Sequence, residues 1–175
     1  MSGGPAWAAG ATLQVEAPVN GATCNITLPG GGGADGGQFS LGRYIQAEFE
    51  ANGGTAATLP VQVTITGCDG DAGTTQPALK VSGTTLADNV RVFNNAADSA
   101  AGFMLRAEKY TGSLTDFYST TDPQVVKSGD NTYDGSAGLK AGGTVDYTVG
   151  FVVPPGKTAA SGDVNASVTF DFLYH

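Results

Sequence analysis

The chain has 175 residues, which suffices for one domain with a substantial core and is short for two. Its 16 acidic and 8 basic residues give a formal net charge of −8, which argues against nucleic acid or an anionic membrane surface as the main partner. The 27 glycines and the low share of charged residues, 14%, favour short strands joined by glycine turns, and no apolar run approaches the ~20 residues of a membrane-spanning helix.

The first residues form a candidate N-terminal extension. Residues 1–10 are too few for a complete signal peptide and lack its basic start. Ala6-Trp7-Ala8 has the small-x-small form of a cleavage site, so one interpretation is the tail of a signal peptide whose start lies upstream. A plain or expression-derived extension fits the same residues, and both interpretations stay open.

Alternation of apolar and polar residues predicts strands along the chain. In the first, at residues 11–17, the apolar residues alternate with polar ones until a proline and an Asn-Gly turn interrupt them. Further strands are expected at residues 22–28, 38–42, 59–65, 77–82, 89–94, 102–110 and 144–153. Residues 44–49 fit either a strand or a single helical turn, and residues 116–143 are polar with few apolar positions.

The last strand is the longest regular pattern in the sequence. Every second residue from Val164 to Tyr174 is apolar, and the residues between them are mostly polar. Such alternation predicts a half-buried strand, and only His175 follows it. An uncovered strand edge invites pairing with another chain, so we expect this strand to be paired or covered. Its apolar face consists of Val164, Ala166, Val168, Phe170, Phe172 and Tyr174.

Cys24 and Cys68 predict one structural disulfide. Each lies in or beside a predicted strand, they form no Cys-x-x-Cys pair, and the sole histidine is the last residue. A zinc site or a thiol catalyst therefore lacks its other groups. A disulfide indicates an oxidising compartment.

The sequence offers no recognisable catalytic constellation. The carboxylates are scattered through turns, no Gly-x-Ser-x-Gly elbow is present, and the Gly31-x-Gly33-x-x-Gly36 spacing precedes a short strand instead of a helix. An Asp-rich stretch at residues 69–73 lacks the later ligands of a calcium loop. We therefore expect a non-enzymatic, secreted or periplasmic β-sandwich without metal or cofactor.

Four segments resemble one known family in order. They are Val19-Asn20-Gly21-Ala22-Thr23-Cys24-Asn25-Ile26, Phe39-Ser40-Leu41-Gly42-Arg43-Tyr44 with Phe49, the strand at residues 59–69 that contains Cys68, and the alternating C-terminal strand with its penultimate tyrosine. In these segments the chain resembles a chaperone–usher pilus subunit of the type 1 fimbrial kind, and the resemblance extends over residues 11–175.

The resemblance implies an all-β fold, an immunoglobulin-like sandwich that lacks its final strand. A donor strand from a neighbouring subunit fills the gap in the fibre, after a periplasmic chaperone has filled it first and an outer-membrane usher has taken part in assembly. The implied product is a head-to-tail homopolymer, an extracellular fimbria on the cell surface that supports adhesion. Its subunits reach the surface through the periplasm.

Carried over by position, residues 1–18 would be the N-terminal extension and residues 19–175 the pilin domain. The donor strand would turn Ala9, Ala11, Leu13, Val15 and Ala17 inward. The acceptor groove and chaperone-binding strand would be the apolar face from Val164 to Tyr174, with the carboxylate of His175 as the chaperone anchor. Val15 and Ala17 depart from the Phe and Gly that are common in the family.

Two other interpretations are kept. One is a minor, adaptor or adhesive subunit of the same fold. The other is a secreted β-sandwich carbohydrate-binding module or hydrolase, which would need an aromatic platform or paired carboxylates. Most aromatic residues fall at alternating strand positions typical of a core, and the remaining candidates for stacking on sugars are Trp7, Tyr110, Phe117, Tyr118 and Tyr133.

Overall fold

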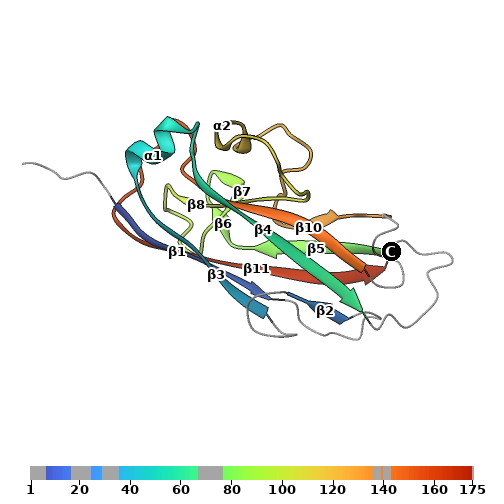
Figure 1. Cartoon of the computed structure of the whole chain (residues 1–175). Helices are drawn as coiled ribbons and strands as arrows, with labels where there is room; N and C mark the ends of the chain where they lie inside the picture. The colour runs from blue at the N-terminus through green and yellow to red at the C-terminus, as the bar shows by residue number, and fades with distance from the viewer. Residues whose placement is uncertain are drawn as a thin grey trace, which may run out of the picture.

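The computed structural model describes residues 7–16, 25–28, 36–66, 77–135, 139 and 143–174, which form a sandwich of two β-sheets (Figure 1). The strands are β1 (Trp7–Glu16), β2 (Asn25–Thr27), β3 (Gly36–Ile45), β4 (Thr55–Thr66), β5 (Pro77–Gly83), β6 (Thr85–Leu86), β7 (Asn89–Phe93), β8 (Gly102–Arg106), β9 (Asp130–Thr132), β10 (Gly143–Val152) and β11 (Gly162–Tyr174). The helices are α1 (Gln46–Ala51) and α2 (Leu114–Phe117). One sheet has the order β3-β1-β11-β5-β9 and the other β2-β4-β10-β8-β7-β6.

The predicted strands with the clearest alternation are confirmed. Val61, Val63 and Ile65 of β4 are buried, and the residues between them are more exposed. β10 pairs with β4 in antiparallel register, with Val145 opposite Val63 and Tyr147 opposite Val61. Period-two patterning therefore placed the inner faces of these strands correctly.

The segment at residues 44–49, for which a strand or a helical turn was predicted, contains the end of a strand and the start of a helix. β3 continues to Ile45, and α1 begins at Gln46. The Glu48 carboxylate accepts a hydrogen bond from the backbone N–H of Ile45 at 2.8 Å, which satisfies a donor at the helix start. Phe49, the one buried residue of α1, packs edge-on against Phe151 with ring centroids 5.0 Å apart.

A second apolar cluster lies outside the main core. It consists of Leu86, Val92, Met104, Phe117, Val125 and Val152. The segment at residues 116–143, which was expected to be polar with few apolar positions, supplies Phe117 and Val125 to this cluster. Phe117 was a candidate for stacking on sugars, and that prediction is wrong because its side chain is completely buried.

Arg106 anchors the same segment. Its guanidinium is buried and donates to Glu108 at 2.8 Å and Asp122 at 2.7 Å. It also donates to the backbone carbonyl of Phe117 from Nε at 3.0 Å and from Nη2 at 2.7 Å. The guanidinium carbon lies 4.7 Å from the ring centroid of Tyr110, within cation–π range. A single side chain thus ties together the connection that covers the outer cluster.

Two tyrosines link β9 and its following turn to β10. The hydroxyl of Tyr147 is hydrogen-bonded to that of Thr132, and the hydroxyl of Tyr133 donates to the backbone carbonyl of Asp146. Burial raises the pKa of Tyr133 to about 12 and also raises the pKa of Tyr147. Each shift favours the neutral phenol in the folded chain.

We expect the free energy of unfolding to fall as pH rises from about 10 to about 12. An unfolded tyrosine loses its proton near pH 10, so in this interval the unfolded chain binds fewer protons than the folded one and is stabilised relative to it. Urea unfolding at intervals between pH 8 and 12 measures this slope. Tyr133→Phe should reduce it, and an equal slope in the variant would contradict the assignment.

Candidate functional site: the groove beside the C-terminal strand

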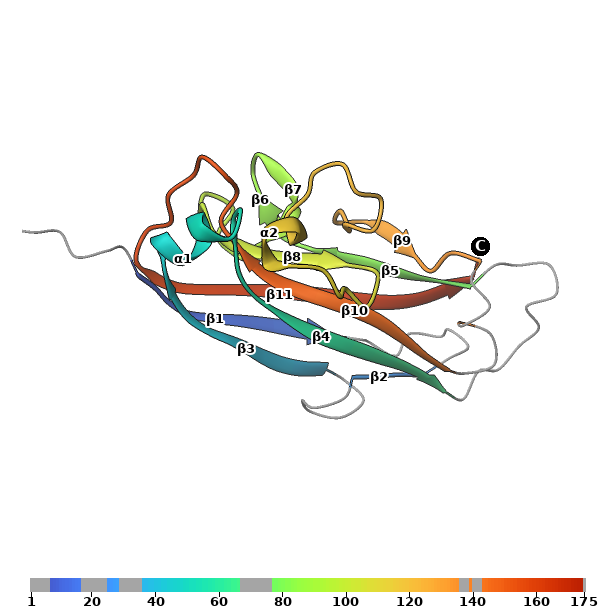
Figure 2. The same cartoon turned by 45° about the horizontal axis from the view of Figure 1, so that its top comes forward.

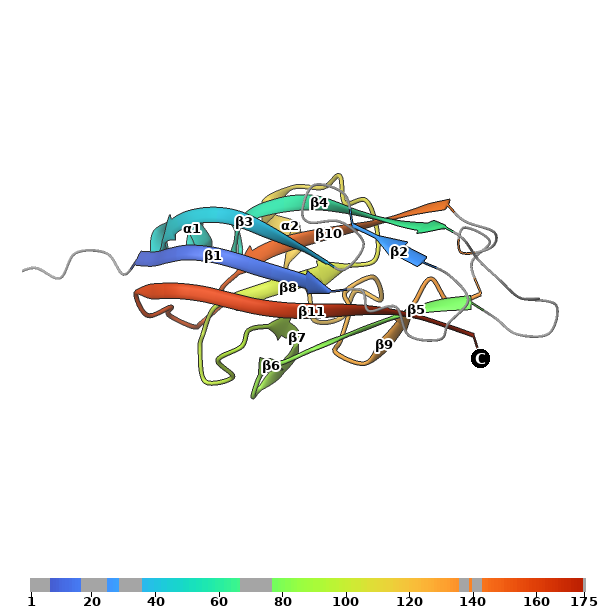
Figure 3. The same cartoon turned by 90° about the horizontal axis from the view of Figure 1, so that it is seen from below.

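β1 lies between β3 and β11 in the same sheet (Figure 3). It runs parallel to β11, with Leu13 opposite Ala166 and Val15 opposite Val168. It runs antiparallel to β3, where Leu13 is opposite Phe39. The N-terminal segment therefore folds back onto its own chain and occupies a place between two strands that are distant from it in sequence.

The apolar side chains of β1 enter the core. Ala11, Leu13 and Val15 are 0%, 1% and 1% exposed, whereas Thr12 and Gln14 are partly exposed. These three residues point into the core of their own chain, and their role as a donor strand in a neighbouring subunit stays a prediction. Burying Leu13 and Val15 contributes about 1.5–3 kcal/mol each, which makes this strand a substantial part of the fold's stability.

A bulge interrupts β1 near its start. The register shifts against both neighbouring strands between Ala8 and Ala11. Gly10 lies in this bulge with φ 121°, and a Cβ there would lie 3.2 Å from a carboxylate oxygen of Asp163. Glycine is favoured at such a backbone angle. The regular alternation of β1 thus begins at Ala11.

The predicted groove residues of β11 are buried as far as Phe172, Tyr174 is half-buried, and β1 covers only part of them. Val164, Ala166 and Val168 pair with β1 residues, and the last β1 pair joins Glu16 to Thr169. Phe170 and Phe172 lie beyond this pair, and Tyr174 packs edge-on against Phe172 at 5.0 Å between ring centroids. In the described part of the chain, no strand pairs with this edge of β11 after Thr169.

β3 forms the other wall of the groove, opposite β11. The sequence of β3 was noted above only as part of the family motif, and no role in the groove was predicted for it. Gly42 lies opposite Ala11 and has φ 95°, at a second shift in register. The packing of Tyr44 against Phe49 and Phe151 joins this wall to the core. The Leu-Gly step in the motif was the available signal, because a glycine within a strand indicates a bulge.

Several predicted site residues lie outside the described part of the chain. These are Cys24, Cys68, Ala17 and His175, and for Ala9 only the backbone is described. Asn25 next to Cys24 lies opposite Thr66, two residues before Cys68. The disulfide stays a prediction.

The groove is suited to hold an extended strand. The backbone edges of β3 and β11 that face each other both pair with β1, and apolar side chains line the space between them, which is the requirement for strand addition. Among the residues described, no group of three or more His, Cys, Asp or Glu could hold a metal ion, and no helix is long and apolar enough to cross a membrane.

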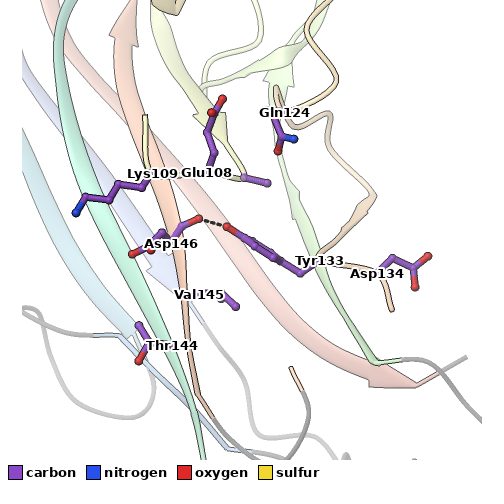
Figure 4. A pocket seen from close by; sticks show the side chains of 9 residues that line it. Glu108, Lys109, Gln124, Tyr133, Asp134, Thr144, Val145 and Asp146 are labelled. Carbon is purple, nitrogen blue, oxygen red and sulfur yellow. Dashed lines mark hydrogen bonds between the residues drawn. The ribbon is translucent and has the colours of Figure 1, made fainter. Parts of the chain in front are cut away.

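A pocket of about 700 Å³ lies elsewhere, where β10 meets the chain after β8 and after β9 (Figure 4). Glu108, Lys109, Gln124 and Asp146 line it together with Tyr133, the one candidate sugar-stacking residue there. The Tyr133 hydroxyl points to the backbone of β10 and is used in a hydrogen bond to Asp146. Glu108 is paired with Arg106.

Two sheets, a long C-terminal strand and an N-terminal strand in the groove beside it define the class of pilin-like β-sandwiches. The sequence matches the family model described as fimbrial protein over residues 11–175. The chain therefore belongs to the fimbrial protein family, and it is a structural pilus subunit that polymerises with other pilin subunits into a surface pilus.

Solved structures agree with this fold. A chain from a chaperone–usher pilus structure, described in connection with rod uncoiling, has 16% identity and a TM-score of 0.60, with 90% of this chain and 91% of that chain covered. PapA, the rod subunit of the P pilus, has 16% identity and a TM-score of 0.55, with 88% and 100% covered. No curated protein matched the chain.

Proposed function

We propose that this subunit polymerises by strand exchange, in which residues 9–17 of a neighbouring copy replace β1 in the groove. The observation that carries the proposal is the placement of Ala11, Leu13 and Val15. These core residues belong to β1, the first element of the described chain. β1 contacts the rest of the domain where it pairs with β3 and β11, the two strands on either side of the groove. An identical segment from a second copy brings the same side chains.

The direction of insertion decides whether the assembly closes. β1 starts beside α1 at one end of the sandwich, whereas β2 starts at the other end, where β4 finishes (Figure 2). A released segment leaves its own domain at the β2 end. If a neighbour's segment entered parallel to β11, the neighbour's domain would also lie at that end, and two copies could exchange segments into a closed dimer.

Insertion antiparallel to β11 gives an open chain. The neighbour's domain then lies at the α1 end, while the segment of the acceptor leaves from the β2 end. Each subunit has one neighbour at each end, and the contact repeats without closing. A pilus requires this arrangement, so we assign the antiparallel direction to the polymer.

Antiparallel insertion also fits the uncovered length of β11. If Leu13 keeps its place opposite Ala166, Val15 lies opposite Val164 and Ala9 lies opposite Phe170. Residues 9–17 of the inserted segment then pair with residues 162–170 of β11, so they reach Phe170, the first residue that β1 leaves unpaired. Either direction gives one parallel and one antiparallel ladder, because β3 and β11 run in opposite directions.

The remaining parts of the proposal follow the family. A periplasmic chaperone would occupy the groove before assembly and bind the carboxylate of His175, and an outer-membrane usher would order the subunits. Residues 1–18 would act as the exchanged extension of a domain at residues 19–175 that Cys24 and Cys68 cross-link. The fibre would support adhesion, and the subunit would have no enzymatic role.

A deletion of residues 1–16 tests the exchange. The shortened chain lacks β1 and should not polymerise alone, but its groove should accept the segment of a full-length chain. Mixed with the full-length subunit, it should form a two-chain adduct and shorten the polymers, as measured by size-exclusion chromatography and electron microscopy. Filaments grown from the shortened chain alone would contradict the proposal.

A further inference from the structure

A second pocket lies at the α1 end of the sandwich. It has a volume of about 320 Å³ and is lined by residues of α1 and of the connection from β10 to β11. Figures 1 and 2 show that α1 and this connection lie at the same end of the sandwich. Its apolar lining comes from Phe49, Val153, Pro154 and Pro155. Glu50 and Thr158 lie at exposed positions on its rim. The Glu50 carboxylate accepts a hydrogen bond from the Gln46 side chain at 3.2 Å.

The pocket has a fixed shape. The Gln46 side chain donates to the backbone carbonyl of Lys157 at 3.0 Å and accepts from the backbone N–H of Ala159 at 3.0 Å. Gly54 has φ 107°, and a Cβ there would lie 2.7 Å from the carbonyl oxygen of Val153. Helix and connection are therefore held together across the pocket, which is formed before any partner arrives.

The groove leads to this pocket. This step rests on the proposed exchange in the antiparallel direction. With Leu13 of the neighbour opposite Ala166, its Ala17 reaches Gly162, the first residue of β11. β1 places Ala8 between Gly162 and Tyr44, and Trp7 opposite Ile45. The neighbour's Pro18 would therefore arrive beside Ile45, the residue before Gln46.

We propose that the pocket receives Pro18 and Val19 of the neighbouring copy. An extended chain advances about 3.3 Å per residue, so these two residues extend about 7 Å beyond the start of β11, past Ile45 and towards Gln46 in the pocket lining. Their side chains are apolar, as is the lining around Phe49 and the two prolines. This contact extends the interface in the groove by two residues. It also fixes the position of the neighbour's domain relative to the α1 end, because that domain begins directly after these residues.

Two labelled peptides test this contact on the full-length subunit. One peptide contains residues 7–17 and the other residues 7–21, and fluorescence anisotropy gives the dissociation constant of each. We expect the longer peptide to bind about tenfold more tightly, the gain from burying about one further apolar side chain. Val19→Asp in the longer peptide should remove this gain.

Variants of the subunit test whether the tighter binding of the longer peptide comes from the pocket. Thr158→Trp narrows the pocket from an exposed rim position and should abolish the advantage of the longer peptide while leaving binding of the shorter one unchanged. Ala47→Trp, an exposed position on the same helix outside the pocket lining, should retain the advantage. Unchanged binding of the shorter peptide also shows that each variant is folded.

The outcomes separate this inference from the proposed function. If both peptides bind equally well, or if Thr158→Trp keeps the tenfold difference, the pocket is not the site and strand exchange itself stands. If neither peptide binds, strand exchange into this groove is contradicted, and the pocket proposal falls with it.

Discussion

Replacing Leu13 by Asp is expected to abolish polymerisation. Leu13 is 1% exposed and central in β1, so the change removes its apolar contacts and places a carboxylate in the core. Truncating a buried leucine alone costs about 2–5 kcal/mol, and an unpaired buried charge adds to that cost. The variant segment should therefore be expelled from its own groove and rejected by the groove of a neighbour.

Gln14→Asp is the matched control for this prediction. Gln14 is adjacent on the same strand, is partly exposed and lies opposite Ser167 and Gln38. The Gln14→Asp substitution introduces the same carboxylate outside the core, so the filament yield should stay close to that of the unaltered chain. Electron microscopy gives the yield, and thermal unfolding should show a lower midpoint only for Leu13→Asp. Normal filaments from Leu13→Asp would rule out β1 as the exchanged strand.

Replacing Arg106 by Ala should lower the free energy of unfolding by about 2–4 kcal/mol. The change leaves the buried carbonyl of Phe117 without its donors and separates Glu108 and Asp122 from their cation. The cost stays below the about 3–5 kcal/mol of a fully buried pair, because these carboxylates are about a third exposed and can be rehydrated.

Urea unfolding at neutral pH measures this effect, with two comparisons. Arg106→Lys keeps the charge but loses the planar fork of donors. Its free energy of unfolding should therefore lie between those of the unaltered chain and of Arg106→Ala. Arg91→Ala removes a partly exposed arginine on β7 and should change the free energy of unfolding by less than about 0.5 kcal/mol. An Arg106→Ala variant as stable as Arg91→Ala would show that the cluster contributes nothing to the fold.

The inner faces of the long strands could be predicted from the sequence. Val61, Val63 and Ile65, like Val164, Ala166 and Val168, alternate with polar residues because one side of each strand faces the core. The same reasoning placed Ala11, Leu13 and Val15 inward. Alternation reports which face is buried and therefore predicts a half-buried strand well.

The partner and direction of β1 could not be predicted in this way. The period-two pattern is the same whether a strand lies in its own groove or in that of another copy, and whether it runs parallel or antiparallel. The bulge at Gly10 depends on where Asp163 and the neighbouring strands lie, which no local pattern contains.

The outer cluster was missed for a related reason. Phe117 and Val125 lie far apart in a stretch dominated by polar residues, with no regular spacing. Their burial depends on Arg106 drawing the connection over the second sheet. Contacts of this kind become visible only when the three-dimensional structure brings the residues together.

Disulfide trapping tests the central claim, that a neighbour's segment replaces β1 in the opposite direction. In the monomer Gln14 lies opposite Ser167, whereas the exchanged register places it opposite Asn165. Polymers grown from a Gln14→Cys, Asn165→Cys chain should form cross-links between subunits, and the monomer of a Gln14→Cys, Ser167→Cys chain should form one within the chain. Cross-links between subunits through position 167 but not position 165 would contradict the antiparallel exchange.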